Sequence, residues 1–152
     1  SGKTTVSTLL GKRLEKEVIE MDDEAVYLLG TSIKDCFEKK GEDYFRNLES
    51  QIACSLREGN ACIISCGGGV IKREENMRYL SENGIIAWIQ RNLDQLYPTD
   101  SRPLSSTDGS IRQLYEERMP IYRKYADIII DNTGDIRDTL KEIMEKTGEG
   151  TI

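Results

Sequence analysis

The sequence predicts a three-layer α/β domain built on a central parallel sheet. Four short apolar runs of strand character alternate with longer segments whose apolar residues recur at helical spacing. Strands and helices that alternate in this way form right-handed crossovers, which make the strands parallel. No repeat, low-complexity tract or Pro/Gly-rich linker divides the 152 residues, so we expect a single domain over residues 1–152.

Three of the four expected strands are almost continuously apolar, which is typical of strands covered on both faces. The expected strands are Glu17–Met21, Ala61–Cys66, Ile85–Ile89 and Ala126–Asp131. Helical patterns occupy the intervals: an apolar pattern from Val6 to Leu14, a stripe of Phe45, Leu48, Ile52 and Leu56 in residues 42–58, and residues 107–125 and 135–147. Ligands of such sheets bind outside the carboxyl ends of the strands, so we look for a site there.

The composition excludes several kinds of chemistry. Histidine is absent, which excludes a Ser–His–Asp hydrolase and a His-ligated zinc or haem centre. The 21 Lys+Arg and 27 Asp+Glu give a formal net charge of -6, which argues against a protein that coats nucleic acid or anionic lipid. Acid–base chemistry is left to carboxylates, Lys, Tyr or Cys. A local basic pocket for a small anion remains compatible with this balance.

The cysteines and the apolar runs bear on cellular location. The four cysteines, at 36, 54, 62 and 66, match no zinc spacing, and we interpret them as small buried side chains, with metal or redox use as the alternative. No apolar run approaches the roughly 20 residues of a membrane span, and the first residues do not resemble a signal peptide. We therefore expect a cytoplasmic protein.

The chain opens with a phosphate-binding pattern. Ser1-Gly2-Lys3-Thr4-Thr5 before a helix is the second half of G-x-x-x-x-G-K-[ST]. In that motif, backbone N–H groups hold phosphate oxygens, Lys3 meets the β- and γ-phosphates, and the Thr4 hydroxyl binds Mg²⁺. The alternative is a chance Gly-Lys-Thr at a helix start. The first glycine and the strand before it are missing, so we expect the intact domain to have about five strands, of which four are readable.

Two carboxylates end the first expected strand. Glu20 and Asp22 are two residues apart, so in a strand both side chains project from the same side. Such a pair can bind Mg²⁺ and can hold or deprotonate a hydroxyl. The alternative is a solvated acidic stretch.

Two further segments indicate binding of a small anion. Arg46 lies near the start of helix 42–58, against the dipole preference, which indicates that it is held there for an anion or for Glu49; a plain surface ion pair is the alternative. Gly67-Gly68-Gly69 directly after a buried strand allows close approach of the backbone to a ligand, with an ordinary loop as the alternative. Ser65, just before, is placed to orient a metal-bound water.

The second half of the chain adds arginines. The Pro-broken polar segment at about residues 97–110 is interpreted as a lid that carries Arg102. Beyond it, Pro120 predicts a kink or boundary in helix 107–125, with Arg118 or Arg123 within reach of an anion and Tyr122 in packing.

Taken in order, these segments resemble the shikimate kinase family. The resemblance rests on motifs in register: Gly30-Thr31-Ser32-Ile33, Phe37, Gly41-Glu42, Phe45-Arg46, Glu49, Gly67-Gly68-Gly69, Arg102-Pro103-Leu104 and Arg118-x-Pro120-x-Tyr122-Arg123. It implies a P-loop fold of the nucleoside-monophosphate-kinase type. It also implies transfer of the ATP γ-phosphoryl group to the 3-hydroxyl of shikimate, in aromatic amino-acid biosynthesis.

The resemblance also implies roles for individual residues. The family's catalytic residues correspond to Asp22, Lys3 and Arg102. The shikimate site corresponds to Asp22, Arg46, Gly67, Gly68, Gly69 and Arg118, and its helical segment covers about residues 31–58. The ATP site corresponds to Ser1, Gly2, Lys3, Thr4, Thr5 and Arg102, the Mg²⁺ site to Thr4 and Glu20, directly or through water, and the adenine loop to Asn132–Asp135. Shikimate and ATP are the expected partners of a monomer that uses neither nucleic acid nor membrane.

The chain departs from the family pattern at two positions. Glu20 stands where the family often has Asp, and Gln95 stands where a basic residue packs on adenine. Two alternatives remain open: a related small-metabolite kinase, such as one for gluconate, and a nucleotide-binding module of the same fold that has lost catalysis.

Overall fold

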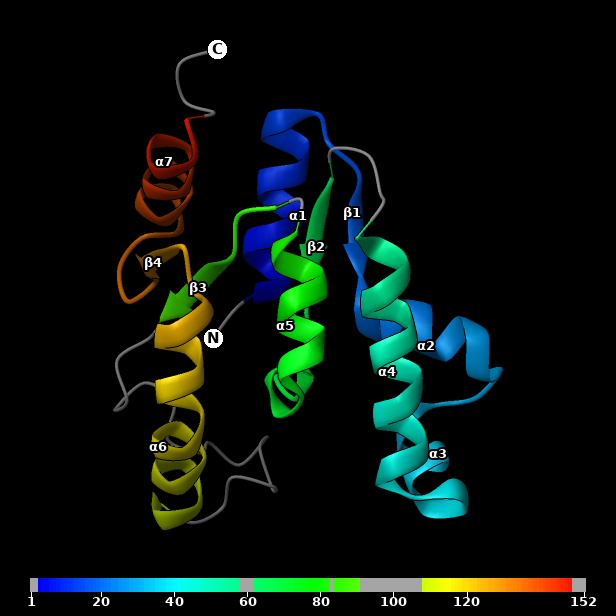
Figure 1. Ribbon diagram of the computed structural model, residues 1–152. Coiled ribbons are helices and arrows are strands. Elements are labelled where there is room, and N and C mark those ends of the chain that lie inside the picture. Colours follow the sequence, from blue (N-terminus) through cyan, green and yellow to red (C-terminus); the bar gives the residue numbers. More distant parts are fainter. Residues whose placement is uncertain (1–2, 58–61, 83, 91–107, 149–152) are drawn as a thin grey trace. The chain divides into compact units, whose positions relative to one another are not determined.

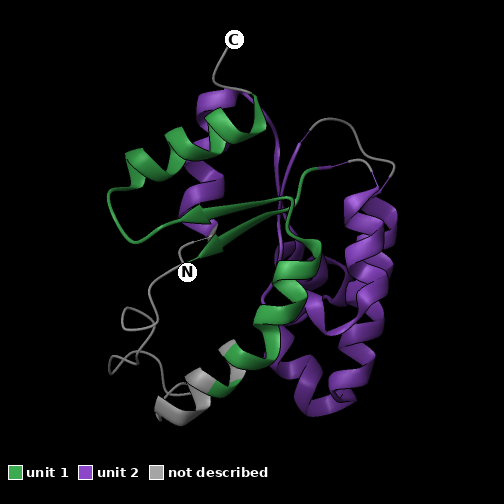
Figure 2. Ribbon diagram, turned by 60° about the vertical axis from the view of Figure 1, so that its left-hand side comes forward, with its two compact units in different colours: residues 1–2, 85–152 green, residues 3–84 purple. Residues whose placement is uncertain are grey.

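A computed structural model describes residues 3–57, 62–82, 84–90 and 108–148 (Figure 1). The chain divides into two compact units, coloured separately in Figure 2. The N-terminal unit comprises residues 3–84. The C-terminal unit comprises residues 85–152 together with 1–2.

The N-terminal unit contains two parallel strands and five helices with a 3₁₀ turn among its described residues. Its elements are α1 Lys3–Leu14, β1 Val18–Glu20, α2 Met21–Leu29, α3 Ile33–Lys40, α4 Glu42–Leu56, β2 Ile63–Ser65, η1 Val70–Lys72 and α5 Glu74–Ser81. Strands β1 and β2 are in register from Val18 opposite Ile63 to Glu20 opposite Ser65. Since both strands end at the same edge, the start of α2 and the glycine loop that follows β2 share that edge.

Local signals in the sequence set the boundaries of α2, α3 and α4. Helix α2 ends at Gly30, whose φ of 69° is in the left-handed region that glycine adopts without strain. Helix α3 is capped by the Ser32 hydroxyl, which accepts a hydrogen bond from the Asp35 N–H at 3.0 Å. Gly41, with φ of 87°, separates α3 from α4. The two helices therefore meet at a sharp corner, and Phe37 lies 5.2 Å from Phe45 between ring centroids.

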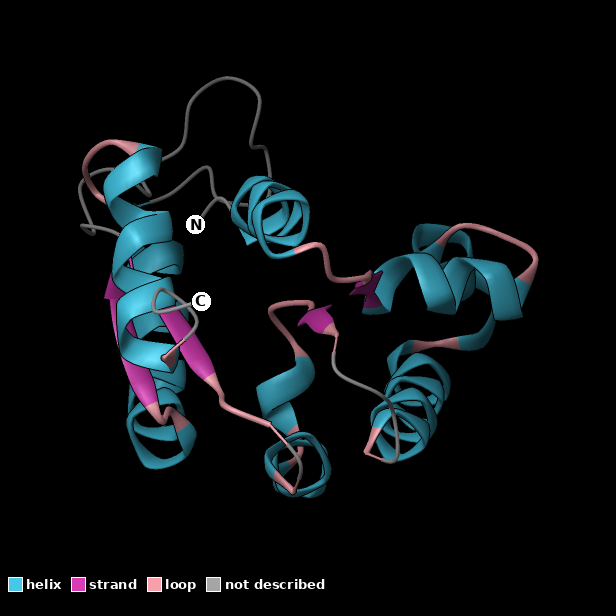
Figure 3. Ribbon diagram, turned by 90° about the horizontal axis from the view of Figure 1, so that it is seen from above, coloured by secondary structure: helices cyan, strands magenta, loops and turns pink. Residues whose placement is uncertain are grey.

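The C-terminal unit contains β3 Ala87–Gln90, α6 Asp108–Tyr125, β4 Ile128–Asp131 and α7 Ile136–Thr147. Its two strands lie side by side and parallel, from Ala87 opposite Ile128 to Gln90 opposite Asp131 (Figure 3). Trp88 of β3 stacks on Tyr122 of α6, with ring centroids 5.0 Å apart and planes 10° apart. This contact fixes α6 against the strand pair.

The strand and helix positions predicted from the sequence are confirmed, with narrower strands. Each predicted strand contains or overlaps an observed one, and both strand pairs are parallel. Helix α6 continues through Pro120 rather than ending there. Of the predicted lid, residues 97–107 lie outside the described part of the chain, and 108–110 are the first residues of α6. No described helix is both long and apolar enough to cross a membrane.

Candidate active site

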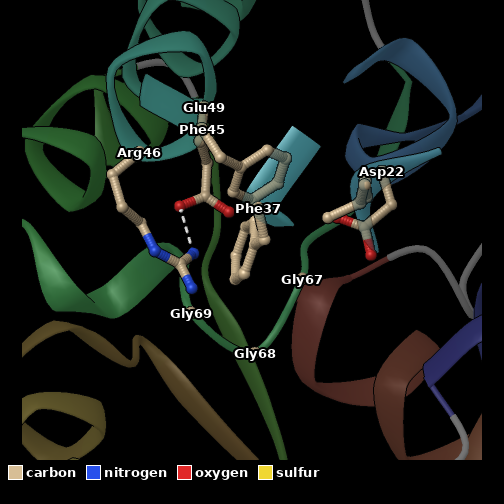
Figure 4. Close-up of a pocket in the computed structure, with 9 residues that line it drawn as sticks. Asp22, Phe37, Phe45, Arg46, Glu49, Gly67, Gly68 and Gly69 are labelled. Atoms are coloured by element: carbon tan, nitrogen blue, oxygen red, sulfur yellow. Dashed lines mark hydrogen bonds and ion pairs between the residues drawn. The ribbon is translucent and has the colours of Figure 1, made fainter. Parts of the chain in front are cut away.

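A pocket opens at the strand edge of the N-terminal unit (Figure 4). Its lining comes from α2, α3, α4 and the glycine loop, through Asp22, Ile33, Phe37, Phe45, Arg46, Glu49, Gly67, Gly68 and Gly69. Figure 4 shows Arg46 and Asp22 on opposite sides of the pocket, with Phe37 and Phe45 between them and the glycine loop below. The predicted substrate residues of this unit are thus brought together in one place.

Arg46 is held from two sides by carboxylates of its own helix. Its Nη1 donates to Glu49 Oε1 at 2.9 Å, and its Nε donates to Glu42 Oε1 at 3.3 Å. The rings of Phe45 and Phe37 lie 5.3 and 5.8 Å from its guanidinium carbon. Nη2 has no hydrogen-bond partner in the described part of the chain, and Arg46, with 14% of its side chain exposed, lines the pocket.

The two glutamates that hold Arg46 differ in environment. Glu49 is buried, with 3 % of its surface exposed, and that burial raises its pKa despite the hydrogen bond from Arg46. Glu42 is exposed, and hydrogen bonds from Lys72 and Arg46 lower its pKa. Both predicted functions of Arg46 are therefore compatible: it pairs with Glu49 and still presents free donors to an anion.

Two glycines after β2 lie in close contact with charged side chains. A Cβ at Gly69 would overlap the guanidinium of Arg46, and a Cβ at Gly67 would lie 2.8 Å from Asp22 Oδ1. Backbone hydrogen bonds from Val70 N to Gly67 O at 3.1 Å and from Lys72 N to Gly69 O at 3.0 Å fold the loop into a turn. The loop is therefore more than a flexible connection: its missing side chains make room for the Arg46 guanidinium and the Asp22 carboxylate.

The predicted pairing of Glu20 and Asp22 on one side of a strand is wrong. Strand β1 ends at Glu20, and Asp22 lies in the first turn of α2, so the alternation of a strand does not apply. Glu20 instead accepts a hydrogen bond from Ser7 Oγ of α1 at 3.3 Å, and the same hydroxyl contacts Thr4 O at 3.1 Å. The two carboxylates thus separate: Glu20 faces the start of α1, and Asp22 faces the glycine loop.

Only part of the predicted nucleotide site lies in the described residues. Helix α1 begins at Lys3, with Thr4 and Thr5 exposed in its first turn. Ser1, Gly2, Gln95 and Arg102 lie outside the described part of the chain. The Asn132–Asp135 segment joins β4 to α7, where Asn132 Oδ1 accepts a hydrogen bond from the Thr139 hydroxyl at 2.8 Å.

The remaining predicted residues lie elsewhere in the two units. Arg118 is partly buried on α6 of the C-terminal unit, and Arg123 on the same helix is exposed. Cys36 is buried as expected, whereas Cys54, Cys62 and Cys66 are partly exposed. Ser65 is buried at the end of β2.

Sequence reasoning gave no role to three polar residues near the site, Glu42, Ser7 and Lys72. Glu42 stands four residues before Arg46, a spacing that predicts contact on a helix. Ser7 and Lys72 gave no such signal, because their partners Glu20 and Glu42 lie 13 and 30 residues away.

A phosphate-loop sequence at the start of a helix, parallel strands and a pocket at their carboxyl edge define an α/β kinase of the P-loop class. The shikimate kinase family model matches residues 1–148, and the chain belongs to this family. Members of the family are ATP-dependent transferases with an alcohol acceptor, so the chain is an enzyme of that kind.

Similar proteins agree with this assignment. The shikimate kinase of Clostridium beijerinckii is 38% identical over 148 residues, covering 95% of this chain and 87% of that protein. The shikimate kinase of Ruegeria pomeroyi is 36% identical over 142 residues, covering 89% of this chain and 72% of that protein.

Solved structures support the fold independently. The Acinetobacter baumannii shikimate kinase in complex with shikimate has a TM-score of 0.87 at 30% identity, covering 99% of this chain and 89% of that one. The Aquifex aeolicus shikimate kinase has a TM-score of 0.86 at 33% identity, covering 99% of this chain and 92% of that one. The predicted α/β P-loop kinase fold is thereby confirmed.

Proposed function

We propose that this chain transfers the γ-phosphoryl group of ATP to the 3-hydroxyl of shikimate, with the pocket of the N-terminal unit as its shikimate site. The observation that carries the proposal is Arg46, held by Glu42 and Glu49, which lines one pocket together with a glycine loop and Asp22. A small hydroxylated acid needs these groups: a cation for its carboxylate and polar groups for its hydroxyls.

The carboxylate of shikimate is bound by Arg46 and, in this proposal, by Arg118. Charge-assisted hydrogen bonds between a guanidinium and a carboxylate are shorter and stronger than neutral ones, and they fix the orientation of the acid. Arg46 is preorganised for this task because Glu49, Glu42 and two aromatic rings restrict its side chain. Arg46 therefore loses little further conformational entropy when the substrate binds.

Asp22 is proposed to hold the 3-hydroxyl and accept its proton. The carboxylate lies against Gly67 on the side of the pocket away from Arg46, so an acid bound by its carboxylate directs its ring hydroxyls toward Asp22 (Figure 4). Backbone groups of Gly67–Gly69 are proposed to bind those hydroxyls. Proximity and orientation of this kind are the main contributions that a protein makes to phosphoryl transfer.

ATP is the co-substrate, and its phosphates are proposed to bind at Ser1–Thr5, with Lys3 and the lid residue Arg102 neutralising their charge. Mg²⁺ prefers oxygen ligands and keeps several waters beside phosphates, so one or two protein ligands suffice. Thr4 and Glu20 fit this requirement, because the hydroxyl of Ser7 joins the first turn of α1 to the Glu20 carboxylate. When bound, the ion would neutralise charge on the phosphates.

We further propose that the enzyme acts as a cytoplasmic monomer without nucleic-acid or membrane partners. The net charge of -6 supports this, since an acidic surface is repelled by polyanions.

A coupled ADP-release assay tests the function, with shikimate and gluconate offered in parallel. Arg46→Ala and Arg118→Ala should each raise the shikimate KM about 10- to 150-fold, the range given by losing a hydrogen bond to a charged group. Asp22→Asn should mainly lower kcat. Arg78→Ala, which removes an exposed arginine of α5, serves as the matched control. A preference for gluconate, or an unchanged KM in both arginine variants, would contradict the proposal.

A further inference from the structure

Charges in the pocket oppose the binding of an acid. Its charged lining consists of Arg46, Asp22 and Glu49, which is one cation against two carboxylates. The rim adds a third carboxylate, since Glu42 accepts a hydrogen bond from Arg46 Nε. A carboxylate ligand of Arg46 would therefore enter a region where the guanidinium is already shared by two glutamates.

Lys72 supplies the opposing charge at this rim. Its Nζ donates to Glu42 Oε1 at 2.7 Å, the same oxygen that accepts from Arg46. Lys72 is the last residue of η1, the turn that follows the glycine loop, and its backbone N–H bonds to Gly69 O at 3.0 Å. The ion pair thus joins the turn after the loop to the first residue of α4, directly beside Arg46.

We propose that Lys72 determines affinity for the acidic substrate by neutralising Glu42, so that the positive charge of Arg46 stays available to the substrate carboxylate. Lys72 is a positioning residue in this role: it acts through Glu42 and Arg46 and need not touch the substrate. The inference rests on the proposed function, because it takes an acid as the ligand of Arg46.

The contacts support an electrostatic role more than a structural one. The side chains of Lys72 and Glu42 are 45% and 48% exposed, and exposed ion pairs contribute little to stability. The 2.7 Å hydrogen bond from Lys72 stabilises the ionised carboxylate and so lowers the pKa of Glu42. With Lys72 present, two cations face the two glutamates that hydrogen-bond to Arg46; without it, Arg46 alone faces both of them where the acid must bind.

Charge neutralisation predicts a specific pattern in a mutant cycle. Lys72→Met leaves Glu42 unopposed and should raise the shikimate KM about three- to tenfold, the effect of one charge several ångströms away in a partly aqueous environment. The kcat and the KM for ATP should stay within about twofold of the wild type. The double variant Lys72→Met with Glu42→Gln should recover most of the lost affinity, because it removes the charge that Lys72 offsets.

Two controls separate this role from a general change. Lys141→Met makes the same change of net charge at an exposed ion pair on α7, and it should leave both KM values unchanged. The increase in KM caused by Lys72→Met should shrink in about 1 M salt, where the screening length falls to about 3 Å.

The outcomes distinguish the inference from the proposed function. If the wild-type enzyme phosphorylates shikimate and Lys72→Met leaves the shikimate KM unchanged, only the role of Lys72 is overturned. A double variant as weak as the single variant would also overturn it, since the effect would then not pass through Glu42. A wild-type enzyme inactive on shikimate would overturn the proposed function and with it this inference.

Discussion

At the scale of single residues, the missing side chain of Gly69 brings the glycine loop into contact with Arg46. The backbone of Gly69 has φ of -86° and ψ of -3°, a conformation open to any L-residue. The requirement for glycine therefore comes from the guanidinium beside it and not from backbone strain. Gly67 has the same relation to the Asp22 carboxylate.

Gly69→Ala should impair shikimate binding while leaving the protein folded. The new methyl group displaces the end of the flexible Arg46 side chain, which can move, so the loss falls on the preformed site rather than on stability. We expect a KM for shikimate raised about tenfold or more, as for loss of one charge-assisted hydrogen bond. Steady-state kinetics and thermal unfolding measured side by side check this.

Gly84→Ala is the matched control for that substitution. Its Cβ would meet only Leu80 O at 3.4 Å, and Gly84 lies outside the pocket. Equal kinetics for the two alanine variants would contradict the importance of the contact at Gly69.

Glu49 predicts a pH dependence of stability. Burial raises its pKa, so in the window from about pH 4.3 up to the folded-state pKa the native state holds more protons than the unfolded state. Its contribution to stability is complete below that window and is lost as pH rises through it. Urea unfolding between about pH 4 and 7 should therefore show the wild type losing stability relative to Glu49→Gln as pH rises.

The contribution of Glu42 to stability depends on pH in the opposite direction. Its pKa is lowered by Lys72 and Arg46, so its contribution is present above the unfolded-state pKa and is lost as pH falls.

For Glu49, unfolding free energies of wild type and Glu49→Gln that change in parallel across this pH range would contradict the prediction, because burial of the ionised Glu49 would then cost nothing.

At the scale of elements, the sequence predicted what depends on neighbours along the chain. Apolar runs and helical stripes located the strands and helices, because burial imposes their periodicity. The strand ends differ from the prediction: β1 is only three residues long, and α2 begins directly after Glu20. Because the helix already starts at Met21, Glu20 and Asp22 do not lie in one strand, and the prediction that paired them on one side of it was wrong.

Contacts between distant elements account for what the sequence could not predict. The turn after the glycine loop meets α4 through Lys72, and α1 meets β1 through Ser7 and Glu20. No spacing between residues in the sequence predicts such contacts, because they depend on how the helices pack against the strand pair. The pocket residues are predictable from the sequence because they sit in motifs shared with a family.

At the scale of the whole molecule, net charge and site charge are separate properties. A chain of net charge -6 repels anions on average, yet its proposed ligands are an acid and a polyphosphate. The positive groups proposed to bind them are few and local: Lys3, Arg46, Arg102 and Arg118, with Lys72 at the rim of the pocket. Since exposed charges are screened beyond about 8 Å at physiological salt, local groups decide binding.

Binding of shikimate should therefore stabilise the folded protein through Arg46 even without ATP. A ligand present at about 100 times its Kd adds about 2.7 kcal/mol to the free energy of unfolding, which for a chain of this size raises Tm by about 5–10 °C. Differential scanning fluorimetry with shikimate alone measures this shift. Arg46→Ala should abolish most of it, whereas Lys141→Met should keep it, because both variants remove one positive charge but only Arg46 lines the pocket. An equal shift in wild type and Arg46→Ala would mean that the acid binds elsewhere.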